Sequence, residues 1–258
     1  MIKIRKFLLF ALAVLTLSAC DMFKIDNYDS PDATVKGQIL DEVTKELVGT
    51  DLNNGSTWRF WDLGPEFAPT WQTRVINYNG EYQDKLFFSG EYNIRFQDCN
   101  FYPFDANNVV VKKGENIFDY NVKPYIRVKN ANIRKEGNEI VATFSLQAGH
   151  PEVRLSNIRL YASTDVHVGE GNTKHNPDGP SFQQSFSPTI EINEATTYTL
   201  RLDLTQTRNN TFFKIQKNYY FRVGAVASIP NPSAVTGASV GTVRRNYAPY
   251  TMINLSAP

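Results

Sequence analysis

TVKGQILDEVTKELV, residues 34–48, carries the pattern that recurs along this chain. Val35, Gly37 and Ile39 alternate with polar side chains, and a turn-forming segment follows at 41–45 before a second short apolar segment. Successive side chains of a β-strand point to opposite faces, so alternation with a period of two residues is typical of a strand with one buried face. The stretch therefore predicts a β-hairpin.

Strand-like runs of this kind return at intervals of about 8–12 residues, with turn signals between them. The clearest turn signals in the first half are Asn79-Gly80, Ser89-Gly90 and Lys113-Gly114. After Pro124 the pattern restarts, with apolar residues alternating over 139–147. No amphipathic helix longer than about ten residues is evident, which argues against an alternating β/α architecture. The sequence therefore predicts an all-β protein with two tandem β-sandwich domains, at 34–124 and 125–258.

The first twenty residues have the pattern of an export signal. Three basic residues precede an apolar run over 7–17, and Leu-Ser-Ala-Cys follows at 17–20. Such a run is too short for a membrane-spanning helix, which needs roughly 20 apolar residues. LSAC resembles the bacterial lipobox, in which the cysteine thiol receives a diacylglyceryl group. We expect residues 1–19 to be a lipoprotein signal peptide, Cys20 to be lipidated, and 20–33 to be a flexible tether. The alternative is a secreted protein cleaved near the same place.

Charge and cysteine content restrict the kinds of partner. Removal of residues 1–19 takes away three basic residues and changes the formal net charge from +1 to −2, so no nucleic-acid partner is expected. The only other cysteine is Cys99. We expect no intrachain disulfide, and we expect Cys99 to be a small buried apolar side chain.

No catalytic residues, metal or cofactor are predicted. The three histidines are His150, His167 and His175, and none has the short spacing to another that a zinc site favours. No Gly-x-Ser-x-Gly motif of a serine hydrolase occurs. Paired carboxylates for glycoside hydrolysis stay open, because their spacing is set in space and not in sequence. The polar, Gly- and Pro-rich segment 168–188 is expected to be a long loop that is either functional or mobile. We therefore expect a protein that is not an enzyme.

Three tryptophans between residues 58 and 71 are the most useful functional hint. Trp58 and Phe60 share one face of the expected strand and should lie in the core. Trp61 has the opposite parity and should point outward, and Trp71 follows a loop. Sugar rings present patches of C–H groups that stack on flat aromatic faces, so Trp61 and Trp71 are candidate ligand-binding residues. The alternative is that both rings plug one end of a sandwich or cover a domain interface.

Two further aromatic residues are candidates for ligand binding. Tyr102 lies in the cluster NFYPF, and Phe213 lies in the loop sequence NNTFFKIQKN. Each would serve as a sugar platform if its ring were exposed. The alternative for Phe213 is a flap that closes over the core.

Two segments resemble known β-sandwich modules. VKGQILDEVTKELVG resembles the opening of carboxypeptidase-regulatory-like, prealbumin-type domains, and the residues that match that pattern are Gly37, Ile39, Asp41, Thr44 and Val48. Lys45 stands where those domains usually have glycine. SGEYNIRF resembles a later strand of the same domain. YYFRVGAVA resembles the penultimate strand of fibronectin-type or immunoglobulin-like modules. The resemblance to prealbumin-type domains implies a non-catalytic accessory domain in the first half, and the resemblance of YYFRVGAVA implies a fibronectin-type or immunoglobulin-like fold in the second.

The lipobox, the segment IDNYDSPDATVKGQILD and the later YFRVGAVAS together resemble a family of two-domain Bacteroidetes lipoproteins of unknown function, whose members occur beside outer-membrane glycan importers. The resemblance implies an outer-membrane lipoprotein, anchored through Cys20 and facing the cell surface, that binds or handles glycans beside an importer. One alternative is a structural adaptor that docks onto outer-membrane transport or adhesion proteins and binds no small ligand. Another is an adhesion or fimbrial subunit that passes its C-terminal tail to a neighbour.

Overall fold

The computed structural model describes residues 29–64, 70–171, 175–230 and 241–256. Residues 32–258 form one compact unit. The expected signal peptide, Cys20 and most of the expected tether lie outside the described residues. In the described part of the chain no helix is long and apolar enough to cross a membrane. The described residues are built almost wholly of β-strands, which confirms the predicted all-β class.

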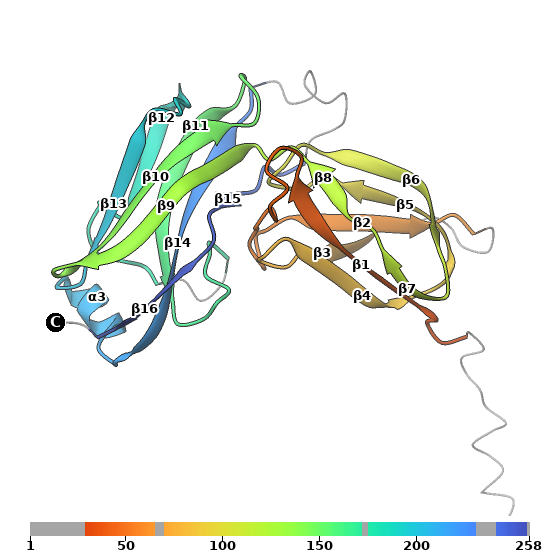
Figure 1. The fold of residues 1–258 in the computed structure, drawn as a ribbon, viewed down its shortest axis with the longest axis horizontal. Helices are drawn as coiled ribbons and strands as arrows, with labels where there is room; N and C mark the ends of the chain where they lie inside the picture. Colours follow the sequence, from red (N-terminus) through yellow and green to blue (C-terminus); the bar gives the residue numbers. More distant parts are fainter. Residues whose placement is uncertain (1–28, 65–69, 172–174, 231–240, 257–258) are drawn as a thin grey trace, which may run out of the picture. The chain divides into compact units, whose positions relative to one another are not determined.

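The first eight strands form two four-stranded sheets that face each other (Figure 1). One sheet contains β1 (Ala33–Asp41), β4 (Glu81–Phe87), β7 (Gly114–Ile117) and β8 (Tyr120–Val122). The other contains β2 (Thr57–Asp62), β3 (Gln72–Val75), β5 (Gly90–Phe96) and β6 (Phe104–Val111). Between the sheets lies a core rich in aromatic side chains, with Trp58 fully buried near its centre.

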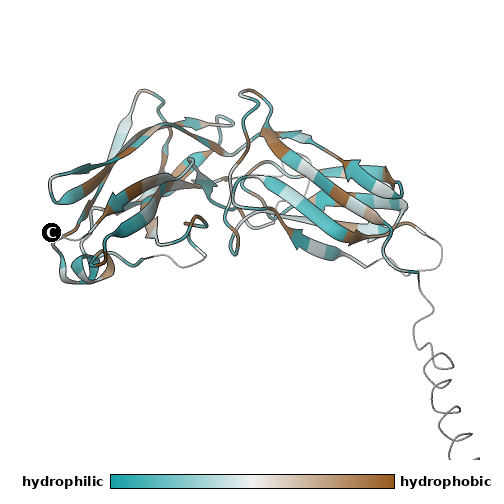
Figure 2. Ribbon diagram, turned by 60° about the horizontal axis from the view of Figure 1, so that its bottom comes forward, coloured by the Kyte–Doolittle hydropathy of each residue, from teal (hydrophilic) through white to brown (hydrophobic). Residues whose placement is uncertain are grey.

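Strand β1 shows the alternation that the sequence predicts, because every second side chain is buried. Figure 2 shows hydrophobic and hydrophilic residues alternating along the strands in the same way. The predicted hairpin partner is only a single bridge, Leu40 to Leu47. The longer neighbours of β1 come from distant sequence: β4 pairs antiparallel with it, and β7 and β8 pair parallel. The turn contains Lys45 at φ 62°, a conformation that glycine adopts at least cost.

The remaining strands form a second sandwich (Figure 1). Its three-stranded sheet contains β9 (Ile126–Glu136), β10 (Glu139–Ala148) and β13 (Thr197–Asp203). Its five-stranded sheet contains β11 (Arg154–Ser163), β12 (Gln183–Glu191), β14 (Lys217–Ser228), β15 (Asn246–Tyr247) and β16 (Thr251–Leu255). A short helix, α3 (Thr207–Phe212), lies between β13 and β14. The apolar core between the sheets is separate from that of the first sandwich.

Side chains and backbone groups from both sandwiches bond directly to one another. Arg127 of β9 donates to both carboxylate oxygens of Asp41 of β1, at 2.5 and 2.9 Å. Asn246 of β15 donates to the Asn100 carbonyl oxygen at 2.8 Å, and Asn100 in turn donates to the Arg245 carbonyl oxygen at 3.2 Å. Asp41, Asn100 and Asn246 are buried, so these bonds replace water that the groups have lost.

The segment expected as one long loop, 168–188, is shorter than predicted because β12 already begins at Gln183. A buried histidine, His175, joins the segment before β12 to the α3 helix. His175 is 6% exposed, and its Nε2 lies 2.7 Å from the Asn209 amide oxygen. Its ring stacks on Phe212 with centroids 4.2 Å apart. The alternation rule could not find this contact, because it joins an irregular segment to the α3 helix.

Acidification should weaken folding through His175. Burial lowers the pKa of His175 below its usual value. Above pH 6.5 the ring is neutral in both states, and below it the unfolded chain takes up a proton that the folded chain resists. We therefore expect the free energy of unfolding to fall from pH 6.5 downward, by at most about 1.4 kcal/mol per pH unit, the limit for one proton. Urea unfolding at pH 7 and pH 5 measures this.

The matched variants are His175→Gln and His167→Gln. His167 is about a third exposed and serves as the comparison for a histidine outside the core. His175→Gln should flatten the dependence. An equal effect of the two substitutions would contradict the assignment to His175.

Candidate functional site

Two tryptophans meet at one end of the β2–β3 pair. Antiparallel pairing of Phe60 with Gln72 brings Trp61 of β2 beside Trp71, which immediately precedes β3. The ring centroids lie 3.5 Å apart with the planes at 79°. Trp71 is 39% exposed, whereas Phe60 is 4% exposed and faces the core. The strand alternation thus places Trp61 on the outer face of the sheet, as its parity predicts, and Trp58 and Phe60 in the core.

A charged pair lies beside the two rings. The guanidinium carbon of Arg95, on β5, is 4.8 Å from the ring centroid of Trp71 and 6.0 Å from that of Trp61. Asp105 of β6 accepts two hydrogen bonds from Arg95, at 2.8 and 2.7 Å. These hydrogen bonds raise the pKa of Arg95. We call this surface, made of Trp61, Trp71, Arg95 and Asp105, the Trp61–Trp71 face. It offers flat apolar rings next to charged hydrogen-bonding groups that can bond to hydroxyls.

Tyr102 and Phe213 are core residues and do not present an exposed ring. Tyr102 is 7% exposed and packs against Tyr125, with ring centroids 4.8 Å apart. Phe213 is 0% exposed and packs between Tyr219 and Phe221. The packing alternative for Phe213 is therefore the one that the structure shows. No local pattern marks either residue as buried, because the neighbours that cover them come from other strands.

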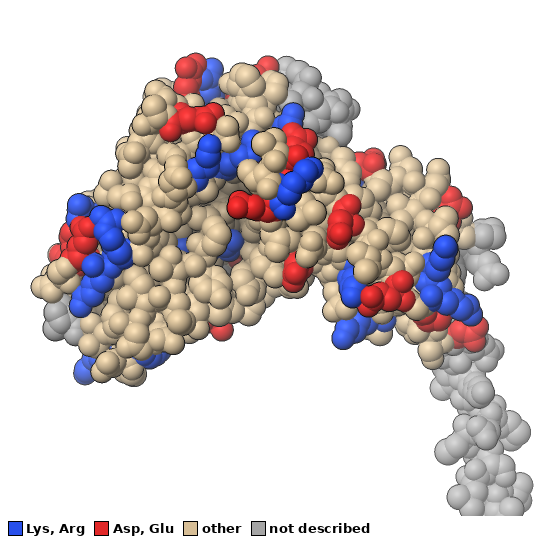
Figure 3. Space-filling model, viewed as in Figure 1, with Lys and Arg blue, Asp and Glu red and all other residues tan. Residues whose placement is uncertain are grey.

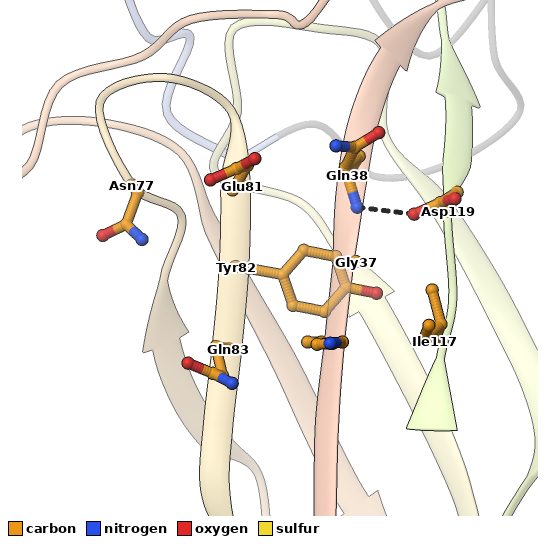
Figure 4. A pocket seen from close by; sticks show the side chains of 9 residues that line it. Gly37, Gln38, Asn77, Glu81, Tyr82, Gln83, Ile117 and Asp119 are labelled. Atoms are coloured by element: carbon orange, nitrogen blue, oxygen red, sulfur yellow. Dashed lines mark hydrogen bonds between the residues drawn. The ribbon is translucent and has the colours of Figure 1, made fainter. Parts of the chain in front are cut away.

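A hollow of about 420 Å3 lies on the outer face of the β4–β1–β7 sheet. Polar side chains dominate its lining, and Asp119 accepts a hydrogen bond from the Gln38 backbone at 2.9 Å (Figure 4). Tyr82 contributes no exposed face to this hollow, since it is 2% exposed and donates its hydroxyl proton to the Phe118 carbonyl oxygen. The polar residues that alternate along β1 are visible in the sequence, but no local pattern predicts a hollow beside them.

A second hollow, of about 450 Å3, lies where the two sandwiches adjoin, and no pattern in the sequence predicted it. Tyr78, Tyr247 and Tyr250 line it together with the buried Arg222. Its residues come from four separate segments of the chain, so only the fold brings them together.

Neither the distribution of charge nor the grouping of possible metal ligands marks out a further site among the described residues. On the face that Figure 3 shows, basic and acidic side chains are interspersed. Within the described ranges, no three His, Cys, Asp or Glu side chains are grouped so that they could hold a metal ion. Cys99 is fully buried, as predicted, and burial raises the pKa of its thiol.

Comparisons with known proteins assign part of the chain to a family. The model for "Domain of unknown function (DUF3823_C)" matches residues 126–231. A solved structure described as a "putative carbohydrate binding protein" from Bacteroides uniformis is 46% identical, with a TM-score of 0.79, and the match covers 87% of this chain and 100% of that one. No curated protein matches.

Two more solved structures share the fold at lower identity. DUF3823 family proteins from Parabacteroides merdae and Bacteroides ovatus are 19% and 18% identical, with TM-scores of 0.64 and 0.63. Each match covers 88% of this chain and 100% of the other. Residues 126–231 of this chain are therefore a DUF3823_C domain, a domain of unknown function, and the chain shares its β-sandwich fold with the DUF3823 family proteins.

Proposed function

We propose that this protein is a non-enzymatic glycan-binding protein and that sugar rings bind at the Trp61–Trp71 face. The observation that carries the proposal is an exposed tryptophan on a rigid sheet face, with a second tryptophan and an arginine–aspartate pair in contact with it. Large exposed aromatic rings beside polar groups are typical of binding surfaces. The name of the 46% identical relative points the same way.

The geometry suits a ligand that is both flat and hydroxylated. Trp71 supplies the exposed apolar surface, and Trp61 supports it from the side. Arg95 and Asp105 hold each other by two hydrogen bonds, so a bound hydroxyl meets donors and an acceptor that are already positioned. Such preorganisation lowers the entropy cost of binding.

Replacement of Trp71 or Trp61 by alanine should weaken glycan binding at least about tenfold, which corresponds to about 1.4 kcal/mol. Each substitution removes apolar surface on which a sugar ring stacks. Tryptophan fluorescence of the chain, titrated with a panel of host and plant polysaccharides, measures the affinity. A saturable shift in the unmodified chain, lost in either variant, is the expected result.

Phe88→Ala is the matched control, because Phe88 is a 44% exposed aromatic side chain that follows β4 on the other sheet of the same sandwich. This variant should bind as the unmodified chain does. The proposal would be abandoned if no polysaccharide of the panel changed the fluorescence, or if the Phe88 variant lost as much affinity as the Trp71 variant. Incubation with a bound polysaccharide should release no new reducing ends.

The location forms a second part of the proposal. Residues 1–19 direct export, Cys20 carries the lipid, and the tether to residue 33 holds the sandwiches at the outer membrane, facing the cell surface beside a glycan importer. Its support is the agreement of basic start, apolar run and LSAC motif. Several acyl chains on one residue would anchor the chain firmly, since each buried CH2 group adds about 0.8 kcal/mol.

Loss of the Cys20 thiol should abolish lipidation, because the lipid is attached through that sulfur. In cells fed a palmitate analogue, the unmodified chain should be labelled and Cys20→Ser should carry no label. Cys99→Ser keeps the proposed attachment site and should be labelled normally. Mass spectrometry of the mature N-terminus gives an independent check, and an unmodified Cys20 within a secreted chain would contradict the assignment.

One observation favours the structural adaptor as a second candidate. Among the described strands, β4 pairs only with β1 and so lies at a sheet edge. Leu86, near its end, is 72% exposed and Phe88 is 44% exposed. Exposed apolar edge strands are surfaces on which other chains can dock. If the polysaccharide panel gives no response and Leu86→Lys abolishes cross-linking to an outer-membrane protein in cells, the adaptor replaces the glycan-binding proposal.

A further inference from the structure

The hollow of about 450 Å3 at the junction of the sandwiches has the size of a small-molecule site, since such sites span roughly 300–1,000 Å3. Its walls come from the segment after β1, the β3–β4 connection, β14, and the β15–β16 region. We call it the junction hollow. The residues that line it are Leu47, Gly49, Tyr78, Asn79, Arg222, Tyr247, Pro249 and Tyr250.

Arg222 is a buried cation at the wall of the junction hollow. Arg222 is only 3% exposed. Its guanidinium donates hydrogen bonds to the carbonyl oxygens of Ala248, Thr50 and Tyr78 at 2.7, 2.8 and 3.2 Å. A guanidinium has five N–H donors, so two of them have no partner among the described residues. No carboxylate of the described residues forms an ion pair with Arg222 either. A buried cation without a counter-ion is costly, which makes such a group a pointer to a ligand.

The acidic group near Arg222 is already engaged elsewhere. Asp51 accepts hydrogen bonds from the Tyr247 hydroxyl at 3.0 Å and from the Gly171 backbone at 2.8 Å. Burial lowers the pKa of Arg222 to about 10, so the guanidinium is still charged at neutral pH. Arg222 thus lines the junction hollow as a charged side chain with two N–H donors that have no partner among the described residues, and the Tyr247 ring lies over its guanidinium at 4.3 Å.

The backbone and rings around Arg222 keep the junction hollow open. A side chain at Gly49 would place its Cβ 2.5 Å from Nη2 of Arg222, so only glycine leaves the guanidinium accessible from that side. Tyr78 and Tyr250 stand 6.3 Å apart by ring centroids, and Tyr250 is 38% exposed. Tyr220 braces Tyr250 edge-on at 5.4 Å. Tyr78 and Tyr250 thus form two walls of the junction hollow.

We propose that the junction hollow is a second binding site, distinct from the Trp61–Trp71 face, for a sugar residue that bears a carboxylate, such as a uronic acid. The carboxylate accepts the two remaining N–H donors of Arg222, in the paired geometry that arginine and carboxylates favour. The apolar side of the sugar ring lies against Tyr250 and Tyr78. The Asn79 amide, which also lines the junction hollow, meets the hydroxyls. A neutral sugar has no carboxylate and would leave the Arg222 guanidinium without a counter-ion.

The test compares methyl glucuronide with two isosteres that lack the charge, methyl glucoside and the glucuronamide methyl glycoside. Binding to the full chain is measured by NMR titration. The glucuronide should bind at least about tenfold more tightly than either neutral probe, because only it pairs with Arg222. Tyr250→Ala should weaken glucuronide binding by about fivefold or more, and Trp71→Ala should leave it unchanged. These comparisons leave Arg222 in place and so do not depend on a variant whose folding is at risk.

Equal affinity for the glucuronide and its amide overturns the proposal, as does the absence of glucuronide binding. Binding that is lost in Trp71→Ala but kept in Tyr250→Ala assigns the glucuronide to the Trp61–Trp71 face and also overturns it. Failure here leaves the first proposal intact, because that one is read from polysaccharide binding and the Trp71 variant alone.

Discussion

Replacement of Arg222 by methionine should lower the free energy of unfolding by about 3 kcal/mol. Methionine fills a similar volume but donates no hydrogen bond, so the carbonyl oxygens of Thr50 and Ala248 lose their partner, while that of Tyr78 keeps the Thr50 backbone N–H. Each buried acceptor left without a partner costs about 1–3 kcal/mol. The variant is also spared the cost of burying a cation, which offsets part of that loss. The cation–π contact with Tyr247, at 4.3 Å, disappears as well.

The measurement also tests whether the sandwiches unfold together. All three tryptophans lie in the first sandwich, whereas Arg222 belongs to β14 in the second. Because Arg222 bonds to Thr50 and Tyr78 of the first sandwich, Arg222→Met should lower the urea midpoint that tryptophan fluorescence reports. Arg134→Met is the control, since that side chain is 42% exposed and its loss should change stability by less than about 0.5 kcal/mol. An unchanged fluorescence midpoint in Arg222→Met would show that these bonds do not couple the sandwiches.

Replacement of Trp58 by alanine should destabilise the fold by about 4 kcal/mol, the middle of the range for a buried tryptophan. Trp58 is 0% exposed and contacts three aromatic rings, with centroid distances of 5.2 Å to Phe60, 5.1 Å to Tyr82 and 6.1 Å to Phe87. Alanine leaves a cavity that β2 and β4, which belong to the two facing sheets, cannot close. Urea unfolding followed by circular dichroism measures the loss.

Trp58→Phe separates packing from polar effects at the same position. The indole N–H of Trp58 has no hydrogen-bond partner among the described residues, so phenylalanine removes a buried donor that gains no hydrogen bond from them. We expect Trp58→Phe to cost less than half as much as Trp58→Ala. If the two substitutions were equally destabilising, cavity volume would not be the cause.

Both predictions bear on function because Trp58 and Arg222 belong to the structure that supports the two proposed sites. Trp58 lies two residues before Phe60, and its packing holds β2, the strand that presents Trp61. Arg222 holds the junction hollow. A variant of either residue that still folds but no longer binds one of the two ligands would therefore show which site that residue supports.

The sequence by itself determined the class and the local facing of side chains. Alternation predicted that Trp58 and Phe60 point inward and Trp61 outward, and the burial of all three agrees. Strand periodicity is a property of neighbours along the chain, so it can be read without knowing the partner strand. The burial of Cys99 was foreseen for a similar local reason: a cysteine without a partner behaves as a small apolar side chain.

Only the tertiary structure decided what lies against what. Tyr102 and Phe213 are buried by residues of other strands, and no periodicity along the chain marks them. The hydrogen bonds of Arg222 reach backbones 172 and 144 positions away, and the Asp41–Arg127 pair spans 86 positions. Local patterns carry no information at such separations, because the contacts depend on how sheets pair and how sandwiches pack. For the same reason the sequence predicted the two tryptophans of the Trp61–Trp71 face but not Arg95 and Asp105. The junction hollow could be recognised only in the fold.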